Sequence, residues 1–126
     1  MRQTEAAPAV APLSGDALLH AVTASMVDLH VRYHHRAPST AKTTMLGDDL
    51  LACVLGGVYT DVEKTMIELQ QSAVVQDTRN AFRVAIQHKF TRRVEELTGR
   101  RVRDFVPNNH VGPDLEIGLF LLEAQD

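Results

Sequence analysis

Between residues 14 and 36, apolar side chains recur at three- and four-residue steps, which is the spacing of an amphipathic helix. They are Leu18, Val22, Met26, Leu29 and Tyr33. Ser14 can cap the N-terminus of this helix, and Leu13 and Leu18 have the spacing of a hydrophobic staple. Pro38 predicts that the helix ends by about Arg36, because a proline disfavours helical conformation in the residue before it.

Two more helices are predicted in the middle of the chain. Thr60 and Glu63 form a capping-box pair that opens the shorter one, which ends near Gln71. Its expected inward side chains are Val62, Met66 and Leu69. The longer helix begins between residues 72 and 77 and ends at residue 98, because Gly99 supplies a left-handed stop. Its apolar stripe comprises Phe82, Ile86, Phe90, Val94 and Leu97.

Four short apolar segments are predicted as strands. Residues 41–46 and 50–56 flank Gly47-Asp48-Asp49, which is turn chemistry, so they form a hairpin. The second of these strands is apolar throughout and is expected to be buried on both faces. Val102–Val106 is a third strand, a loop follows from residue 107 to 114, and Leu115–Leu122 is the fourth strand. Alternation places four residues of that last strand on one face: Leu115, Ile117, Leu119 and Leu121.

The predicted order is α-β-β-α-α-β-β, which indicates an α+β fold. Hairpins favour a four-stranded, mainly antiparallel sheet with the helices packed on one face. The 126 residues fit one domain. Residues 1–13 are rich in Ala and Pro and are expected to be a flexible tail, so the domain covers 14–126.

Composition excludes several classes of protein. Apolar residues make up 44% of the chain and charged residues 23%, which is ordinary for a globular protein. The net charge of -3 does not favour a general nucleic-acid binder. No apolar run approaches the roughly 20 residues of a membrane-spanning helix. A single cysteine and an N-terminus without the order of a signal peptide favour a soluble, cytoplasmic protein, whose only membrane role would be peripheral.

Charge is unevenly distributed along the chain. Residues 79–103 contain eight basic and two acidic side chains, a net charge of +6, whereas the rest has five basic and fourteen acidic groups, a net charge of -9. These cations are the candidate residues for binding a partner or an anion. They are Arg79, Arg83, Lys89, Arg92, Arg93, Arg100, Arg101 and Arg103.

Three roles remain open for this basic segment. Arg83 and Arg93 fall at the edges of the apolar stripe, where arginines lay their stems over a core and pair with acids. Arg100 and Arg101 follow a helix C-terminus, which favours cations. The others could face an anionic partner or nucleic acid. Phe82 and Phe90 are expected in the core by their spacing, so Phe105 is the only aromatic residue close to residues 100–103 that could stack on a base.

No arrangement of catalytic or metal-binding residues is evident in the sequence. His30 and His34 share a helix face beside His35, but no third ligand accompanies them, so we interpret them as a solvated helix end and expect no metal. Asp48-Asp49 lies at a hairpin tip, and Cys53 sits in an apolar run as a buried thiol. We therefore expect no cofactor and no enzymatic activity.

Several segments in fixed order carry a family resemblance. They are Pro38, Thr44-Met45-Leu46-Gly47-Asp48-Asp49-Leu50-Leu51, Val54-Leu55-Gly56-Gly57, Thr60-Asp61-Val62-Glu63-Lys64-Thr65, Arg79 with Phe82, Val94-Glu95-Glu96-Leu97-Thr98-Gly99-Arg100-Arg101-Val102, and Phe120-Leu121-Leu122-Glu123. Over about residues 18–123 the chain resembles the MpsC-type domain of the Na+-translocating membrane potential-generating system. It departs from the family at residues 34–38, where a Gly-rich turn is replaced by His34-His35-Arg36-Ala37-Pro38.

The resemblance implies a small, non-catalytic, self-associating domain that is linked by name to sodium transport across a membrane. The first hypothesis is therefore an interaction or regulatory module, accessory to an ion-transport system, that forms a homodimer and contacts a membrane-associated protein. A homodimer would also cover the second face of the apolar strand at residues 50–55. The alternative is a protein that uses residues 79–103 to bind nucleic acid or an anionic ligand.

Overall fold

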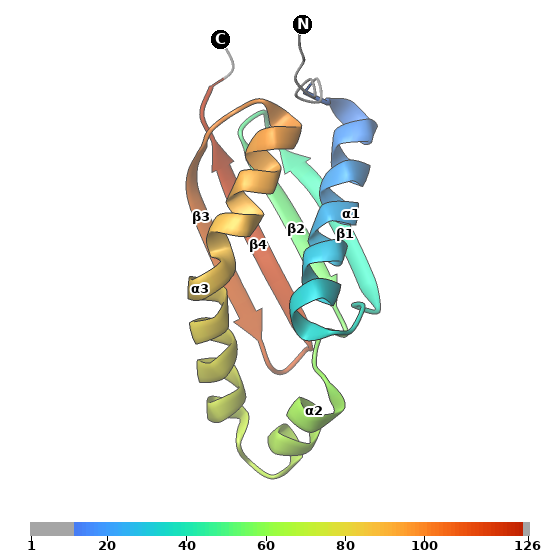
Figure 1. Ribbon diagram of the computed structural model, residues 1–126, viewed down its shortest axis with the longest axis vertical. Coiled ribbons are helices and arrows are strands. Elements are labelled where there is room, and N and C mark those ends of the chain that lie inside the picture. Colours follow the sequence, from blue (N-terminus) through green and yellow to red (C-terminus); the bar gives the residue numbers. More distant parts are fainter. Residues whose placement is uncertain (1–11, 125–126) are drawn as a thin grey trace, which may run out of the picture.

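The computed structural model describes residues 12–124 and has the predicted order of elements. These are α1 (Gly15–His34), β1 (Thr40–Leu46), β2 (Leu50–Gly56), α2 (Asp61–Glu68), α3 (Ser72–Thr98), β3 (Val102–His110) and β4 (Leu115–Leu122). The strands form one antiparallel sheet in the order β1-β2-β4-β3. Helices α1 and α3 lie side by side on one face of the sheet, and α2 lies beyond one end of it (Figure 1). The predicted α+β class is confirmed.

Helix α1 begins and ends close to the predicted residues. Ser14 is its N-cap, although the hydroxyl makes no capping hydrogen bond. The helix ends at His34 because His35 adopts a left-handed conformation with φ 58°. Of the predicted tail, residues 1–11 lie outside the described residues, and the Leu13 amide donates to the Leu97 carbonyl at 2.9 Å. Leu13 therefore joins the start of α1 to the end of α3.

The first hairpin is confirmed, with Leu46 paired to Leu50 across the turn. Gly47 takes the positive φ, 68°, that this turn requires. The second hairpin differs from the prediction because β3 continues through residue 107 to His110. Pro107 is tolerated there since β3 is an edge strand, whose outer side needs no backbone donor. The loop predicted at 107–114 is correspondingly short.

Helix α2 has the predicted capping box, in which Thr60 accepts from the Glu63 amide and Glu63 accepts from the Thr60 amide. Its predicted inward residues are partly wrong. Val62 is 73% exposed and Leu69 65%, whereas Met66 and Ile67 pack against the core. With only eight residues beyond the end of the sheet, α2 has little surface to bury, so its apolar residues were a poor guide to its orientation.

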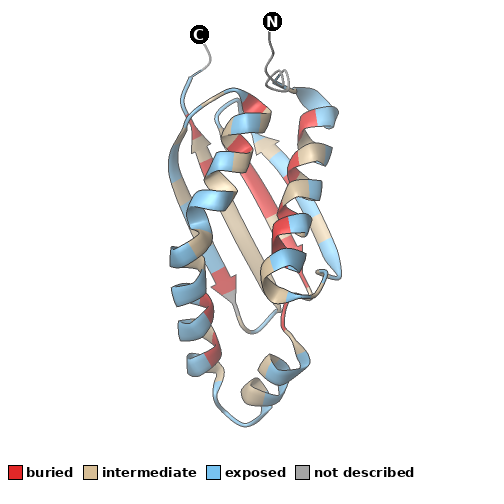
Figure 2. Ribbon diagram, viewed as in Figure 1, coloured by how far each residue is buried: buried red, intermediate tan, exposed pale blue. Residues whose placement is uncertain are grey.

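Helix α3 divides into two parts. Its C-terminal half packs on the sheet through Val94 and Leu97 and stops at Gly99, as predicted. Its N-terminal half extends past the sheet, and Phe82 is only partly covered there, by the rings of Tyr33 and His34. The predicted stripe therefore holds best where a strand lies beneath the helix (Figure 2).

The core lies between the helices and one face of the sheet. Leu51, Cys53 and Leu55 of β2 and Phe120 and Leu122 of β4 point into it. The alternate residues of those strands point the other way. The predicted set on β4 does share a face, but it is the face away from the helices, as the pairing of Leu121 with Leu50 and of Leu119 with Ala52 requires. Burial of β2 on both faces is only partial, since Leu50 and Val54 are half-buried.

Candidate functional site

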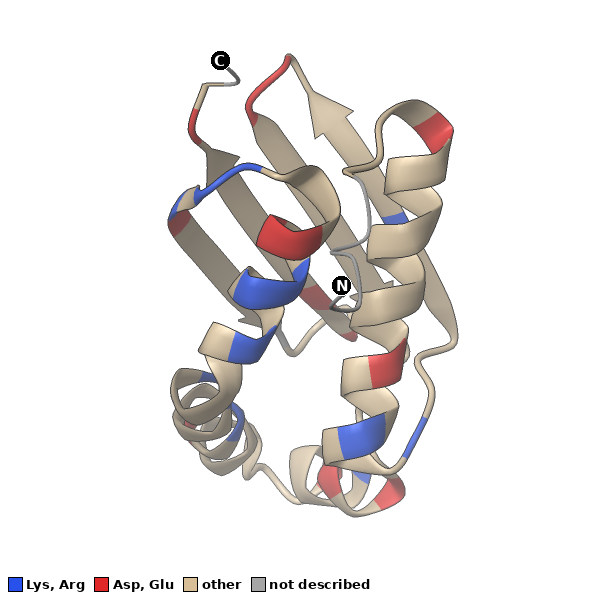
Figure 3. Cartoon of the chain, turned by 45° about the horizontal axis from the view of Figure 1, so that its top comes forward, with Lys and Arg blue, Asp and Glu red and all other residues tan. Residues whose placement is uncertain are grey.

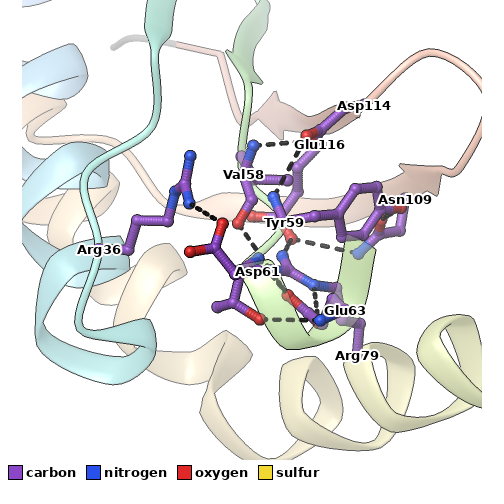
Figure 4. Close-up of polar contacts among 10 residues, drawn as sticks. Arg36, Val58, Tyr59, Asp61, Glu63, Arg79, Asn109, Asp114 and Glu116 are labelled. Carbon is purple, nitrogen blue, oxygen red and sulfur yellow. Dashed lines mark hydrogen bonds and ion pairs between the residues drawn. The ribbon is translucent and has the colours of Figure 1, made fainter. Parts of the chain in front are cut away.

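A buried ion cluster joins α2, α3 and β4 (Figure 4). The Arg79 guanidinium is the centre of the cluster, and the residue is 3% exposed. Its Nε and Nη2 donate to the two carboxylate oxygens of Glu63 at 2.7 and 2.6 Å, and Nη2 also donates to the Val58 carbonyl at 2.8 Å. Nη1 donates to Glu116 Oε2 at 3.5 Å. Such paired, planar contacts are the geometry in which arginine binds carboxylates best.

Tyr59 forms the floor beneath this arginine. The guanidinium carbon lies 4.8 Å from the centre of the ring, and the hydroxyl donates to Asn109 Oδ1 at 2.8 Å. Asn109 in turn donates to Glu116 Oε2 at 3.3 Å. Burial raises the pKa of Tyr59 to about 12, so the phenol stays protonated. The aromatic ring therefore holds the cation in place without sharing in proton transfer.

The segment before α2 is fixed to the sheet by Asp114. Its two carboxylate oxygens accept from the amides of Val58 and Tyr59 at 2.8 and 3.3 Å. Glu63 is held by both the capping box and Arg79. Burial acts to raise the pKa of Glu63, but hydrogen bonds from Arg79 and Thr60 outweigh it and lower the pKa. Glu63 therefore remains ionised, and the cluster holds α2 and α3 to this end of the sheet.

A cleft opens between the two long helices beside this cluster. Its cavity volume is about 50 Å³, and the cleft is partly open to solvent. Its floor is formed by β2, β4 and β3. Gly118 contributes no side chain to this floor, and a Cβ atom at that position would lie only 3.2 Å from the Phe105 ring. Arg79 and Arg83 are the two candidate cations that line it. A concave surface lined mainly by apolar side chains, with a few polar groups, is the usual form of a small-molecule site.

The structure scatters the other candidate cations rather than gathering them. Arg93 donates to Ser25 Oγ at 3.4 Å, and Arg100 donates to the carbonyls of Glu123 and Asp48 at 2.8 and 2.7 Å. The remaining four are exposed: Lys89, Arg92, Arg101 and Arg103. Basic residues occur along α3 and in the turn after it, with acidic residues between them in the last turns of the helix (Figure 3).

The interpretation of the histidines as a solvated helix end is wrong for His30. Its side chain is buried, at 2% exposed, and neither ring nitrogen has a hydrogen-bond partner among the described residues. Its ring lies 4.7 Å from that of His34, which packs on Phe82. Burial, followed by the charges nearby, lowers the pKa of each histidine to about 4, so both are neutral at pH 7. Across residues 12–124 no group of three or more His, Cys, Asp and Glu side chains could hold a metal ion.

The sheet has a second surface of interest, the uncovered face. It consists of Leu46, Leu50, Ala52, Val54, Val106, Leu115, Ile117, Leu119 and Leu121. Strand pairing places Ala52, Leu119 and Val106 in one row across β2, β4 and β3. Leu46 and Val106 are about half exposed, at 53% and 52%. Within the described residues, no helix covers this surface.

Sequence reasoning selected Arg79 and Glu63 but missed that they meet. Each was assigned a local role, one in a basic run and the other in a capping box. The contact is between residues sixteen apart in the chain, and Asn109 and Asp114 join it from the predicted loop. The one available signal was the position of Arg79 on α3, three residues before Phe82 of the apolar stripe.

Comparison with known proteins places the chain in a family. The profile of the family described as "Na+-translocating membrane potential-generating system (MpsC)" matches residues 16–124. The chain belongs to the MpsC family. Searches of curated proteins and of solved structures give no match. The MpsC match covers every helix and strand of the fold except the first residue of α1. No helix within residues 12–124 has the length and apolar character to cross a membrane.

Proposed function

We propose that this MpsC chain is a non-catalytic interaction module that forms a homodimer through the uncovered face of its sheet. One observation carries the proposal. An antiparallel sheet with a solvated face alternates apolar and polar residues along its strands. Strands β2 and β4 do not, because Leu50, Val54 and Leu119 are apolar on the side away from the helices. Contiguous apolar surface of this kind marks an interaction site.

A second copy of the chain fits this surface well. Apart from Leu46 and Val106, the apolar residues lie on the two central strands, and five polar residues lie on the edge strands of the same face. These are Thr40, Lys42 and Thr44 on β1, and Asp104 and Asn108 on β3. An apolar centre inside a polar rim is the usual anatomy of a protein interface. Two such faces, related by a two-fold axis, would cover each other, and two-fold dimers are the commonest oligomers.

The chemistry of the polar residues supports a role other than catalysis. Arg79 and Glu63 satisfy each other at short range, so neither is poised to act on a substrate. Burial raises the pKa of Cys53, which keeps the thiol protonated and poorly nucleophilic. The family description supports a place for the module as an accessory of a membrane ion-transport system. We infer a cytoplasmic location at the membrane periphery, in contact with a membrane-associated protein.

The alternative of nucleic-acid or anion binding by the basic segment now depends on Lys89, Arg92, Arg101 and Arg103, the exposed members. It predicts binding to mixed RNA or DNA at low salt that weakens steeply as salt is added. Absence of binding at low salt would remove this alternative.

Light scattering coupled to size-exclusion chromatography tests the dimer. At roughly 100 μM, a complex of ordinary affinity is almost fully formed, so the scattering mass should be twice that of the chain. The mass should fall towards that of one chain on dilution. A single-chain mass at the highest concentration would contradict the homodimer.

A further inference from the structure

The cleft on the helix side of the sheet has a strongly apolar and aromatic lining. The chain contains four phenylalanines, and all four line this cleft: Phe82, Phe90, Phe105 and Phe120. Phe105 stacks on Phe120 with ring centres 4.6 Å apart, whereas Phe82 stands at the mouth and is partly exposed. Met26, Ile86 and Leu55 add aliphatic surface. The cleft lies opposite the uncovered face, so its role is independent of self-association.

One end of the cleft is polar, and it contains an unsatisfied donor. Arg83 Nη2 donates to Asn80 Oδ1 at 2.7 Å. Arg83 Nη1 is buried and has no hydrogen-bond partner among residues 12–124. A buried guanidinium N–H without an acceptor is costly, so this atom calls for an acceptor from outside the described chain. The neighbouring Arg79 differs, because its three nitrogens are already engaged by Glu63, Glu116 and Val58.

The other polar groups at this end allow an anion to approach Arg83. His34 lines the cleft as a neutral imidazole, since burial lowers its pKa to about 4. Glu116 is the opposing charge, but its Oε2 already accepts from Arg79 and Asn109. Burial raises the pKa of Glu116 despite the arginines nearby. Among the described residues that line the cleft, Arg83 is therefore the one that keeps a buried donor available to a single negative group.

We propose that the cleft binds a small amphipathic carboxylate, whose carboxylate accepts a hydrogen bond from Arg83 Nη1 and whose apolar body lies against Phe82, Phe90 and Phe105. Arginine binds carboxylates through charge-assisted hydrogen bonds that are stronger than neutral ones. The apolar walls supply affinity for an aromatic or branched aliphatic body. Because the cavity volume is only about 50 Å³ and the cleft is partly open to solvent, the body should be no larger than one aromatic ring with a short chain, part of which stays outside the cleft.

The test uses the full chain and a pair of matched probes, 3-phenylpropionate and its neutral amide. In a titration followed by amide NMR shifts at neutral pH, 3-phenylpropionate should cause saturable shifts at Phe105, Gly118 and Ile86, which line the cleft. A charged hydrogen bond is worth about 1.5–3 kcal/mol, so the amide should bind at least roughly tenfold more weakly. This comparison needs no variant. Equal affinity for acid and amide, or no shift at roughly 10 mM acid, overturns the proposal.

Two arginine variants locate the contact. Arg83→Gln removes the cation and should weaken binding of the acid about tenfold while leaving the amide unchanged. Arg92→Gln is the matched control, an exposed arginine on the same helix outside the cleft, and should bind both probes as the natural chain does. If Arg83→Gln binds the acid as tightly as the natural chain, the assignment to Arg83 is wrong.

Discussion

The two faces of the sheet are built from alternate residues of the same strands, yet α1 and α3 cover only one of them. On the covered face, Leu51, Phe120 and Leu122 are buried beneath α1 and α3. On the uncovered face, their neighbours Leu50, Leu119 and Leu121 are only half-buried. The difference lies in what covers them rather than in residue type. A strand that is apolar on both sides therefore has one face in the core and a second face that remains for the proposed association.

The covered face also differs along its length. At the end of the sheet where α1 begins and α3 ends, the apolar side chains of Val22, Val94 and Leu122 lie in the core. At the other end, where α2 joins the layer, Arg79, Glu63 and Glu116 take the place of apolar contacts (Figure 4). The ion cluster is needed there because α2 is short and buries few apolar side chains of its own.

The largest contrast is expected between adjacent leucines of β2. Leu51→Ala opens a cavity in the covered core and should cost about 2–5 kcal/mol of unfolding free energy. Leu50→Ala removes the same atoms from the uncovered face and should cost about 1 kcal/mol or less in the isolated chain, since much of that side chain is already hydrated. Urea unfolding at a low protein concentration measures both. Equal losses would mean that the two faces are equally covered.

The ion cluster offers the next contrast, between two arginines four residues apart on α3. Arg79→Met leaves Glu63 and Glu116 partly buried without their partner and should cost about 3–5 kcal/mol. Arg83→Met removes a side chain that, within residues 12–124, donates a hydrogen bond to the exposed Asn80, and it should change stability by less than about 1 kcal/mol. Thermal and urea unfolding of the pair decide this. A mild effect of Arg79→Met would show that the cluster is dispensable to the fold.

The buried histidines predict a pH dependence with a definite sign. The pKa of His30 is about 4 in the folded chain and 6.5 in the unfolded one, so the unfolded state binds more protons between these values. Its contribution to stability is complete above pH 6.5 and is lost as the pH falls, by about 3 kcal/mol at pH 4. His34 shifts in the same direction.

Replacing His30 isolates that contribution. His30→Leu should flatten the fall in unfolding free energy between pH 6.5 and 4, whereas His20→Gln, on an exposed position of α1, should leave it as in the natural chain. Urea unfolding at a series of pH values is the measurement. If His30→Leu loses stability on acidification as steeply as the natural chain, the buried imidazole is not the group responsible.

Local patterns predicted the order of elements because capping and turn chemistry act over a few residues. Thr60 with Glu63, Gly47 and Gly99 each fix a boundary by their own backbone or side-chain geometry. Patterns failed where a long-range contact decides the outcome. Two of the three residues predicted to face inward on α2, Val62 and Leu69, were wrong because the rest of the molecule, rather than the periodicity of the helix, sets which side is covered.

The candidate site was harder to foresee for the same reason. Arg79 and Arg83 belong to the same basic run of the sequence. In the folded chain Arg79 is paired with Glu63, whereas Arg83 keeps a buried donor without a partner among the described residues. Only the packed structure shows this difference. His30 was assigned to solvent because it is near a helix end, although its side chain is buried there, at 2% exposed. Alternation did group the four β4 residues of the uncovered face, but it could not say which face of the sheet the helices would cover.

The most direct test of the central claim is sedimentation velocity on two matched apolar-to-arginine variants. Leu119 lies at the centre of the uncovered face, and Val84 is 69% exposed on α3, away from that face. The account predicts that the natural chain and Val84→Arg sediment as dimers, whereas Leu119→Arg sediments as a folded monomer, because an arginine at the centre of an apolar interface would be buried without a partner. A dimeric Leu119→Arg, or a dimer lost only in Val84→Arg, would contradict association through the sheet.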